Sequence, residues 1–146
     1  MERTDIVGDI DTGRYRWGLV PLRIAVGLVF VMHGGQKLFV FGLEGTADIM
    51  GKLGIPLATL AAAIVMAAEL LGGLAIILGL YARWAGAALA IEMLVAIPVA
   101  RLHGGFFAPY GFEFEFALLG ACLTFAAFGT GGASLDRLIA APRPPR

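Results

Sequence analysis

The side chains that could do chemistry in this chain are few, and three of them interrupt apolar segments near mid-length: Arg23, Glu69 and Glu92. A charged side chain at the centre of a bilayer costs about 2.5–3.5 kcal/mol on insertion scales, so it usually faces a bundle interior and has a partner there. We expect Arg23 to form an ion pair with Glu69 that holds two helices in register. Glu92 then either carries a proton or faces a neighbouring subunit.

A denser polar group lies at the outer ends of the same segments. A quinone head group needs hydrogen-bond donors for its carbonyl oxygens, aromatic walls and an opening to lipid, and this group offers all three. Lys37, Arg101 and His103 could donate, and Glu115 could relay protons; Glu113 is close enough in sequence to leave the choice of glutamate open. The residues expected to contact the cofactor are His33, Phe106, Phe107 and Tyr110. Aromatic residues beside a turn are also typical interfacial anchors.

Several other chemistries lack the residues that they need. The single cysteine, Cys122, excludes a disulfide or a dithiol centre within the chain. Two histidines without a C-x-x-C-H motif do not predict haem, and no spacing of ligands specifies a metal, so none is predicted. The formal net charge of zero argues against a nucleic-acid partner.

The elements that must position these groups are apolar helices. Hydrophobic residues make up 59% of the 146 residues and charged residues 15%, against about 45–50% and about 25% in soluble proteins. A helix crosses the hydrocarbon layer in about 20 apolar residues. Four segments qualify, namely 17–41, 57–80, 81–100 and 112–129. The sequence therefore predicts an all-α protein, a four-transmembrane-helix bundle.

The segments between and after these spans also carry structural signals. Residues 42–56 and 103–111 are rich in glycine and are expected to be loops, and 79–84 a tight turn. Pro98 should kink the third span, and Ser134 should begin a short C-terminal interfacial helix. The predicted organisation is a tail over 1–16, a bundle over 17–129, and a turn, short helix and tail over 130–146.

Small residues and helical spacing indicate how the spans pack. Arg23, Gly27, Phe30, Gly34 and Lys37 alternate in steps of four and three, so they share one helical face, which should point inward. Further small residues cluster at Gly72-Gly73 and Ala85-Gly86-Ala87-Ala88. Such faces let helix backbones approach closely in lipid. They predict a compact bundle that could continue into a homo-oligomer or a larger membrane complex.

The basic residues predict the orientation. Both termini and the second loop share one side, which carries Arg3, Arg14, Arg16, Arg83, Arg137, Arg143 and Arg146, whereas the other side has Lys37, Lys52 and Arg101. Because cytoplasmic loops carry the excess of Lys and Arg, both termini should be cytoplasmic. The expected location is the bacterial cytoplasmic (inner) membrane, crossed several times.

The order of these motifs resembles the DoxX family of small bacterial membrane proteins over residues 20–138. The matching residues are Arg23 with Gly27 and Phe30, Gly34-Gly35-Gln36-Lys37-Leu38, Glu69-Leu70-Leu71-Gly72-Gly73, Leu78-Gly79 with Arg83, His103 with Phe106-Phe107, Gly111-Phe112-Glu113-Phe114-Glu115-Phe116-Ala117-Leu118, and Gly129-Thr130-Gly131-Gly132-Ala133-Ser134-Leu135-Asp136. The resemblance implies a four-helix membrane bundle. It also implies relatives linked to thiosulfate oxidation with quinone as acceptor, or to redox-defence enzymes.

Three functions follow as hypotheses. The first is a membrane subunit of an oxidoreductase assembly whose outer polar cluster contacts quinone or a small reductant. The second is a non-catalytic accessory or scaffold subunit in which the polar residues only specify packing. The third is a small proton-coupled transporter, which is disfavoured because four-pass multidrug exporters place their carboxylate in span one, where this chain has Arg23.

Overall fold

The computed structural model describes residues 4–129, 131 and 134–140. The ends of both predicted tails, residues 1–3 and 141–146, lie outside this part of the chain, as do residues 130, 132 and 133 of the predicted glycine turn. Every regular element in the described part is helical. In chain order they are α1 (Thr4–Gln36), the π-helical turn η1 (Lys37–Phe41), α2 (Gly42–Lys52), α3 (Ala58–Leu78), α4 (Ala82–Ala96), the π-helical turn η2 (Ile97–Arg101), the 3-10 turn η3 (Leu102–Gly104), α5 (Glu113–Phe128) and α6 (Leu135–Ala140).

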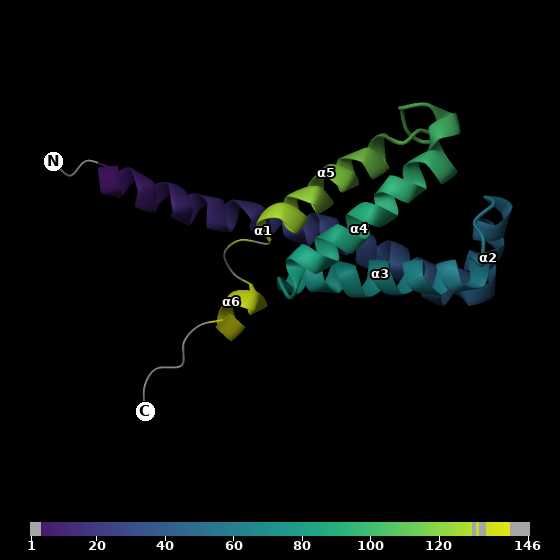
Figure 1. Ribbon diagram of the computed structural model, residues 1–146, viewed down its shortest axis with the longest axis horizontal. Helices are drawn as coiled ribbons and strands as arrows, with labels where there is room; N and C mark the ends of the chain where they lie inside the picture. The colour runs from purple at the N-terminus through teal and green to yellow at the C-terminus, as the bar shows by residue number, and fades with distance from the viewer. Residues whose placement is uncertain (1–3, 130, 132–133, 141–146) are drawn as a thin grey trace.

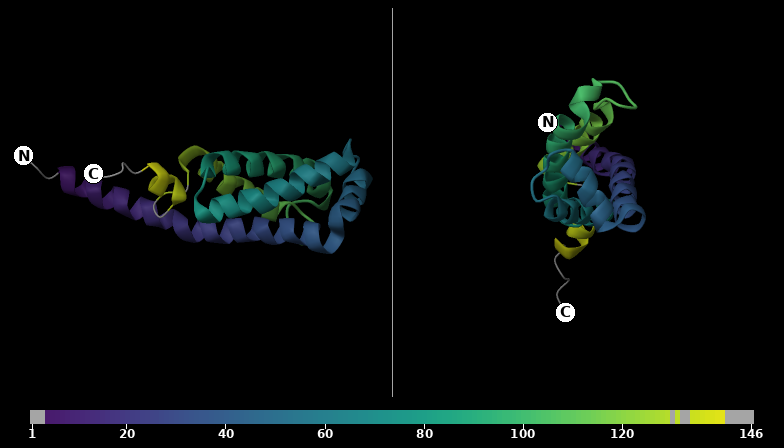
Figure 2. Two further views of the ribbon diagram at one scale, coloured as in Figure 1. Left: turned by 90° about the horizontal axis from the view of Figure 1, so that it is seen from below. Right: turned by 90° about the vertical axis from the view of Figure 1, so that its right-hand side faces the viewer.

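The four long helices form two pairs that diverge from each other. α1 packs along α3 and α4 packs along α5, while α1 and α5 touch only slightly. Figure 1 shows the two pairs as the arms of a V, which opens toward α2. Figure 2 shows that α6 and the start of α1 lie at the opposite end of the bundle. We call the two ends the α2 end and the terminal end.

Glycine residues set the separation within each pair. A Cβ added at Gly73 of α3 would lie 2.8 Å from the Gly27 carbonyl oxygen of α1, and one added at Gly86 of α4 would lie 2.9 Å from the Cys122 carbonyl oxygen of α5. At both crossings the neighbour is backbone, which cannot move aside without separating the helices. The predicted role of small residues in close helix packing is therefore confirmed.

The core is small, and the outer surface is apolar. The fully buried side chains are Phe30, Ile76, Leu89, Cys122 and Phe125, whereas large apolar residues such as Leu28, Ile64 and Ile91 are exposed. An apolar surface of this extent suits lipid contact rather than water. Within the part of the chain that the structure describes, three helical stretches are long and apolar enough to cross a membrane, Trp17–Lys52, Ala58–Leu78 and Ala82–Gly104. α5 has 16 residues, so the predicted fourth span is not confirmed.

One predicted loop is wrong in most of its length. Residues 42–52 of the expected loop 42–56 form α2, because Ala47 and Met50 bury one face of this segment against Ala62 of α3. Gly42, with φ of 68°, adopts the backbone conformation that glycine tolerates best and redirects the chain from η1 into α2.

Other predicted boundaries agree with the structure only in part. The turn predicted over 79–84 joins α3 to α4 but covers only 79–81, and a short helix, α6, follows Ser134. Pro98 lies within η2, where the α-helical hydrogen-bond pattern gives way to a π-helical turn, as expected for a proline that disturbs its helix. α1 begins at Thr4, well before the predicted start of the first span.

We predict that Gly73→Ala destabilises the bundle by about 1–3 kcal/mol, the usual range for overpacking, because the added methyl group meets the α1 backbone. The loss should appear as a lower thermal unfolding midpoint in detergent. Gly35→Ala is the matched control, since nothing lies within 4 Å of a Cβ added there. Equal midpoints for the two variants would contradict the packing described.

Candidate functional site

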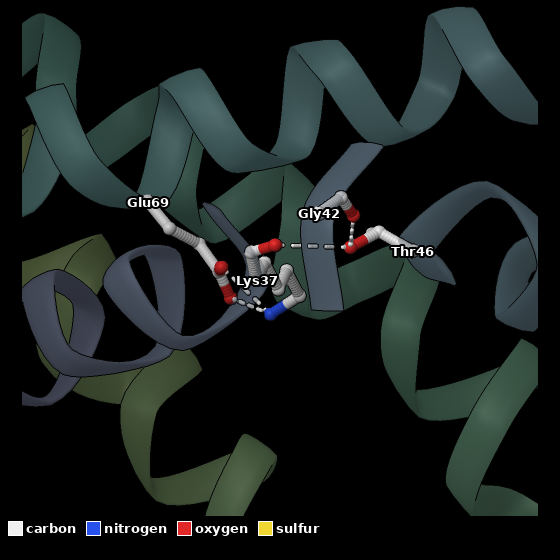
Figure 3. Close-up of polar contacts among 4 residues, drawn as sticks. All are labelled: Lys37, Gly42, Thr46 and Glu69. Atoms are coloured by element: carbon white, nitrogen blue, oxygen red, sulfur yellow. Dashed lines mark hydrogen bonds and ion pairs between the residues drawn. The ribbon is translucent and has the colours of Figure 1, made fainter. Parts of the chain in front are cut away.

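An ion pair joins η1, the turn that follows α1, to the middle of α3. The Lys37 Nζ atom lies 2.7 Å from Glu69 Oε1 and 2.6 Å from Oε2 and donates to both oxygens (Figure 3). The Glu69 side chain is 6% exposed and that of Lys37 23%. A charge-assisted pair of this geometry neutralises two charges that lipid would otherwise reject.

The predicted pairing of Glu69 with Arg23 is wrong, and the reason is helix register. Gly27 packs against Ile77, and Gly34 packs against Leu70 and the Glu69 Cβ atom. This antiparallel register brings Lys37 beside Glu69. Arg23 lies fourteen positions earlier on the same helix, which at about 1.5 Å per residue is roughly 21 Å away along the axis. The inward face predicted for α1 is nevertheless confirmed, because Arg23 and Phe30 are both buried.

The turn that carries Lys37 has its own polar support. In η1 the α-helical bonding pattern changes, and Thr46 of α2 donates its hydroxyl hydrogen toward the Gly42 carbonyl oxygen at 2.8 Å, with the Lys37 carbonyl oxygen at 3.4 Å (Figure 3). Single π-helical turns occur frequently at functional sites. Sequence reasoning missed Thr46, although its position four residues after Gly42 is the spacing of a helical hydroxyl-to-carbonyl bond.

A second carboxyl group adjoins this ion pair. Glu92 of α4 lines the same cavity as Lys37 and Glu69, and its carboxyl group lies within the electrostatic field of both. The Glu92 Oε2 atom is buried and has no partner within the described residues. Two carboxyl groups and one ammonium group therefore meet where α1, α3 and α4 converge.

The two candidate glutamates of α5 have different roles in the structure. Glu115 accepts a hydrogen bond from Arg101 Nε at 2.8 Å, whereas Glu113 accepts one from the Ala108 backbone N–H at 2.9 Å. The Arg101 side chain is 44% exposed and that of Glu115 is 12% exposed. Glu113 thus supports the loop before α5, and Glu115 faces the bundle. The Oε2 atom of Glu115 is buried without a partner in the described part of the chain.

These groups line a cavity of about 740 Å³ between the two helix pairs. Its polar lining comprises His33, Gln36, Lys37, Thr46, Glu69, Glu92, Arg101 and Glu115. Most of the remaining wall is aliphatic or aromatic. Ile64 of α3 and Ile91 and Val95 of α4 line it and are also exposed on the outer surface, so the cavity reaches the lipid-facing side between α3 and α4.

Not every residue of the predicted outer cluster reaches this cavity. His33 does, and its ring lies 6.2 Å from that of Phe114, an aromatic wall that sequence reasoning missed. His103, Phe106, Phe107 and Tyr110 are exposed on the loop before α5 and lie outside the cavity lining. Phe106 packs edge-to-face with Phe107 and Phe112 instead. Within the described residues, no group of three or more His, Cys, Asp or Glu side chains is placed to hold a metal ion.

We predict that Lys37→Met and Glu69→Leu each cost about 3–5 kcal/mol of unfolding free energy, because each leaves one buried charge without its partner. The double variant should lose much less than the sum. A double-mutant cycle by denaturant titration in mixed micelles measures this coupling. Arg101→Met is the comparison, with a smaller expected loss because its side chain is 44% exposed. A coupling free energy near zero would contradict the ion pair.

Comparison with known proteins places this chain in a family. The model of the DoxX family matches residues 18–103. The chain is 31% identical to "Putative oxidoreductase CatD" of Bacillus subtilis, over 84% of this chain and 87% of that protein. It is 34% identical to "Inner membrane protein YphA" of Escherichia coli, over 82% of this chain and 88% of the relative.

A further similar protein comes from a mycobacterium, whereas no match comes from solved structures. "Uncharacterized membrane protein Rv3486" of Mycobacterium tuberculosis is 32% identical, over 82% of this chain and 79% of the relative. No solved structure gives a significant match. The matched region contains Lys37, Glu69, Glu92 and Arg101, all of which line the cavity. On this evidence the chain is a membrane protein that belongs to the DoxX family.

Proposed function

We propose that this protein is the membrane subunit of an oxidoreductase assembly and that its cavity binds the head group of a quinone. The observation that carries the proposal is the group of Lys37, Glu69 and Glu92 at the wall of an otherwise apolar cavity. Ionisable residues inside a membrane protein usually mark a ligand or proton pathway. A relative whose printed name is "Putative oxidoreductase" supports the same class of function.

The size and composition of the cavity suit such a ligand. Small-molecule sites usually measure about 300–1,000 Å³ and combine apolar walls with a few polar groups, and this cavity of about 740 Å³ falls within that range. The exposed lining residues Ile64, Ile91 and Val95 provide a route by which an isoprenoid tail could remain in lipid. The head group would then lie at the polar wall.

The polar groups can supply what quinone reduction requires. Reduction to the quinol adds two electrons and two protons, and each carbonyl oxygen receives one of the protons. In our proposal the electrons come from a reductant bound by a partner subunit. Lys37 donates a hydrogen bond to one carbonyl oxygen, and a proton shared by Glu69 and Glu92 is transferred to it. At the second oxygen Arg101 donates the hydrogen bond, and Glu115, ionised beside Arg101, relays the second proton to that oxygen from water.

A charge argument supports a proton on the carboxyl pair. One ammonium group offsets one carboxylate, so a second carboxylate beside Glu69 would be an uncompensated charge within the bilayer, at a cost of several kcal/mol. Of Glu69 and Glu92, it is Glu92 whose Oε2 atom has no partner within the described residues. A protonated Glu92 can donate either to Glu69 or to a ligand oxygen in the cavity.

We predict that Lys37→Gln weakens the binding of a short-tailed quinone to protein in lipid nanodiscs at least tenfold, which is about 1.4 kcal/mol, because a charged donor is lost. Competition with a radiolabelled quinone analogue measures the affinity. Glu92→Gln should preserve binding, since an amide can still donate, and should abolish proton uptake during reduction by the assembled partner.

The control is Lys52→Gln, since Lys52 lies exposed on α2 and outside the cavity lining. His103→Ala should affect binding less than Lys37→Gln, because His103 also lies outside it. Wild-type protein that binds no quinone, or equal losses for the Lys37 and Lys52 variants, would overturn the proposal.

A further inference from the structure

A second cavity lies at the terminal end of the bundle, far from the polar group just described. It measures about 610 Å³, is open on one side and is lined by the start of the first span, the end of α3 and α6. The residues that line it are Arg23, Ile77, Leu78, Ser134, Leu135, Arg137 and Leu138. Two guanidinium groups and one hydroxyl group therefore share a small space with four aliphatic side chains.

Arg23 is the unusual member of this lining. It is 6% exposed, and its Nε and Nη1 atoms are buried without a hydrogen-bond partner among the described residues. A buried charge without a partner is one of the costliest features in a protein. An arginine retained in this state requires an anion that the described residues do not supply.

Neither the carboxylate expected from the sequence nor that of α6 serves Arg23. Glu69, the partner expected from the sequence, is bound by Lys37. Asp136 of α6 accepts hydrogen bonds from the backbone N–H groups of Tyr81 at 2.8 Å and Ala82 at 3.4 Å. Asp136 thereby fastens α6 to the start of α4. The position of α6 brings Arg137 and Ser134 to the same cavity as Arg23.

We propose that this cavity binds a phosphate group and that the phosphate is carried by an anionic membrane phospholipid. Arginine forms paired hydrogen bonds with phosphate oxygens. Arg23 and Arg137 each bring a guanidinium group that can bind phosphate in this way. The aliphatic residues Ile77, Leu78, Leu135 and Leu138 would contact the acyl chains. A lining of two cationic side chains, one hydroxyl group and four aliphatic side chains matches an amphiphile better than a free anion.

The depth of the site agrees with a lipid head group. The first apolar span begins at Trp17, and Arg23 follows six positions later, about 9 Å along the helix. A long arginine side chain at this depth can extend to the phosphate layer. The excess of basic residues on this side predicts that it faces the cytoplasm, where anionic lipids attract such residues.

Native mass spectrometry of the full chain, released from detergent, provides the test. Wild-type protein should retain phosphatidylglycerol in preference to phosphatidylcholine, with at least a tenfold difference in apparent affinity. Arg23→Gln should remove that preference, and the exposed Arg137→Gln should reduce it while leaving the bundle folded. Arg83→Gln is the matched control, since Arg83 also lies at the terminal end, donates to the Ala126 carbonyl oxygen at 3.2 Å and does not line the cavity.

Inorganic phosphate distinguishes the source of the anion. If millimolar phosphate displaces phosphatidylglycerol from wild-type protein but not from Arg137→Gln, the phosphate site is supported, and a free anion becomes an alternative occupant. The proposal is overturned if wild-type protein shows no preference for phosphatidylglycerol. It is also overturned if Arg137→Gln and a folded Arg23→Gln retain the wild-type preference.

Discussion

A charge within lipid must be neutralised by a partner at the same depth, and the Lys37–Glu69 ion pair meets this constraint for the first helix pair. Glycine contacts at Gly27, Gly34 and Gly73 bring α1 and α3 close together, and the ion pair closes the α2 end of that crossing at 2.6 Å. The π-helical turn begins at Lys37 itself, and the redirection at Gly42 then leads the chain into α2. The helical register and the electrostatics are therefore mutually consistent.

The cavity is a consequence of how the remaining helices join this pair. α4 and α5 pack on each other through Gly86 and Cys122 and diverge from α1 and α3 toward the α2 end (Figure 1). Glu92 and Glu115 come from this second pair and face the space between them. The same divergence leaves apolar residues of α3 and α4 at the opening. A polar wall at depth with an apolar entrance is what a lipid-soluble reactant needs.

The sequence predicted the helical class, the inward face of α1, the small-residue contacts, the turn before α4 and the short helix after Ser134, because each depends on local spacing. It could not assign the partner of Glu69, since depth along two helices does not define their register. The sequence also could not decide which of Glu113 and Glu115 faces the bundle interior. Glu113 is instead bound by the Ala108 backbone N–H, and this contact depends on the conformation of the loop before α5. The segment 42–56 was predicted to be a loop because it is rich in glycine. The apolar face of Ala47 and Met50, which packs against Ala62 of α3, was not recognised from the sequence.

The most direct test of the ion pair uses the fact that Lys37 and Lys52 are the only lysines in the chain. Selective ¹⁵N labelling of lysine in lipid nanodiscs should give two side-chain ammonium signals by NMR. Our account predicts that the protons of one signal exchange slowly with water and that this signal is lost in Lys37→Arg. The same signal should shift in Glu69→Gln and on addition of quinone. The signal of the exposed Lys52 should show none of these effects. Two rapidly exchanging ammonium signals, both insensitive to Glu69→Gln, would contradict it.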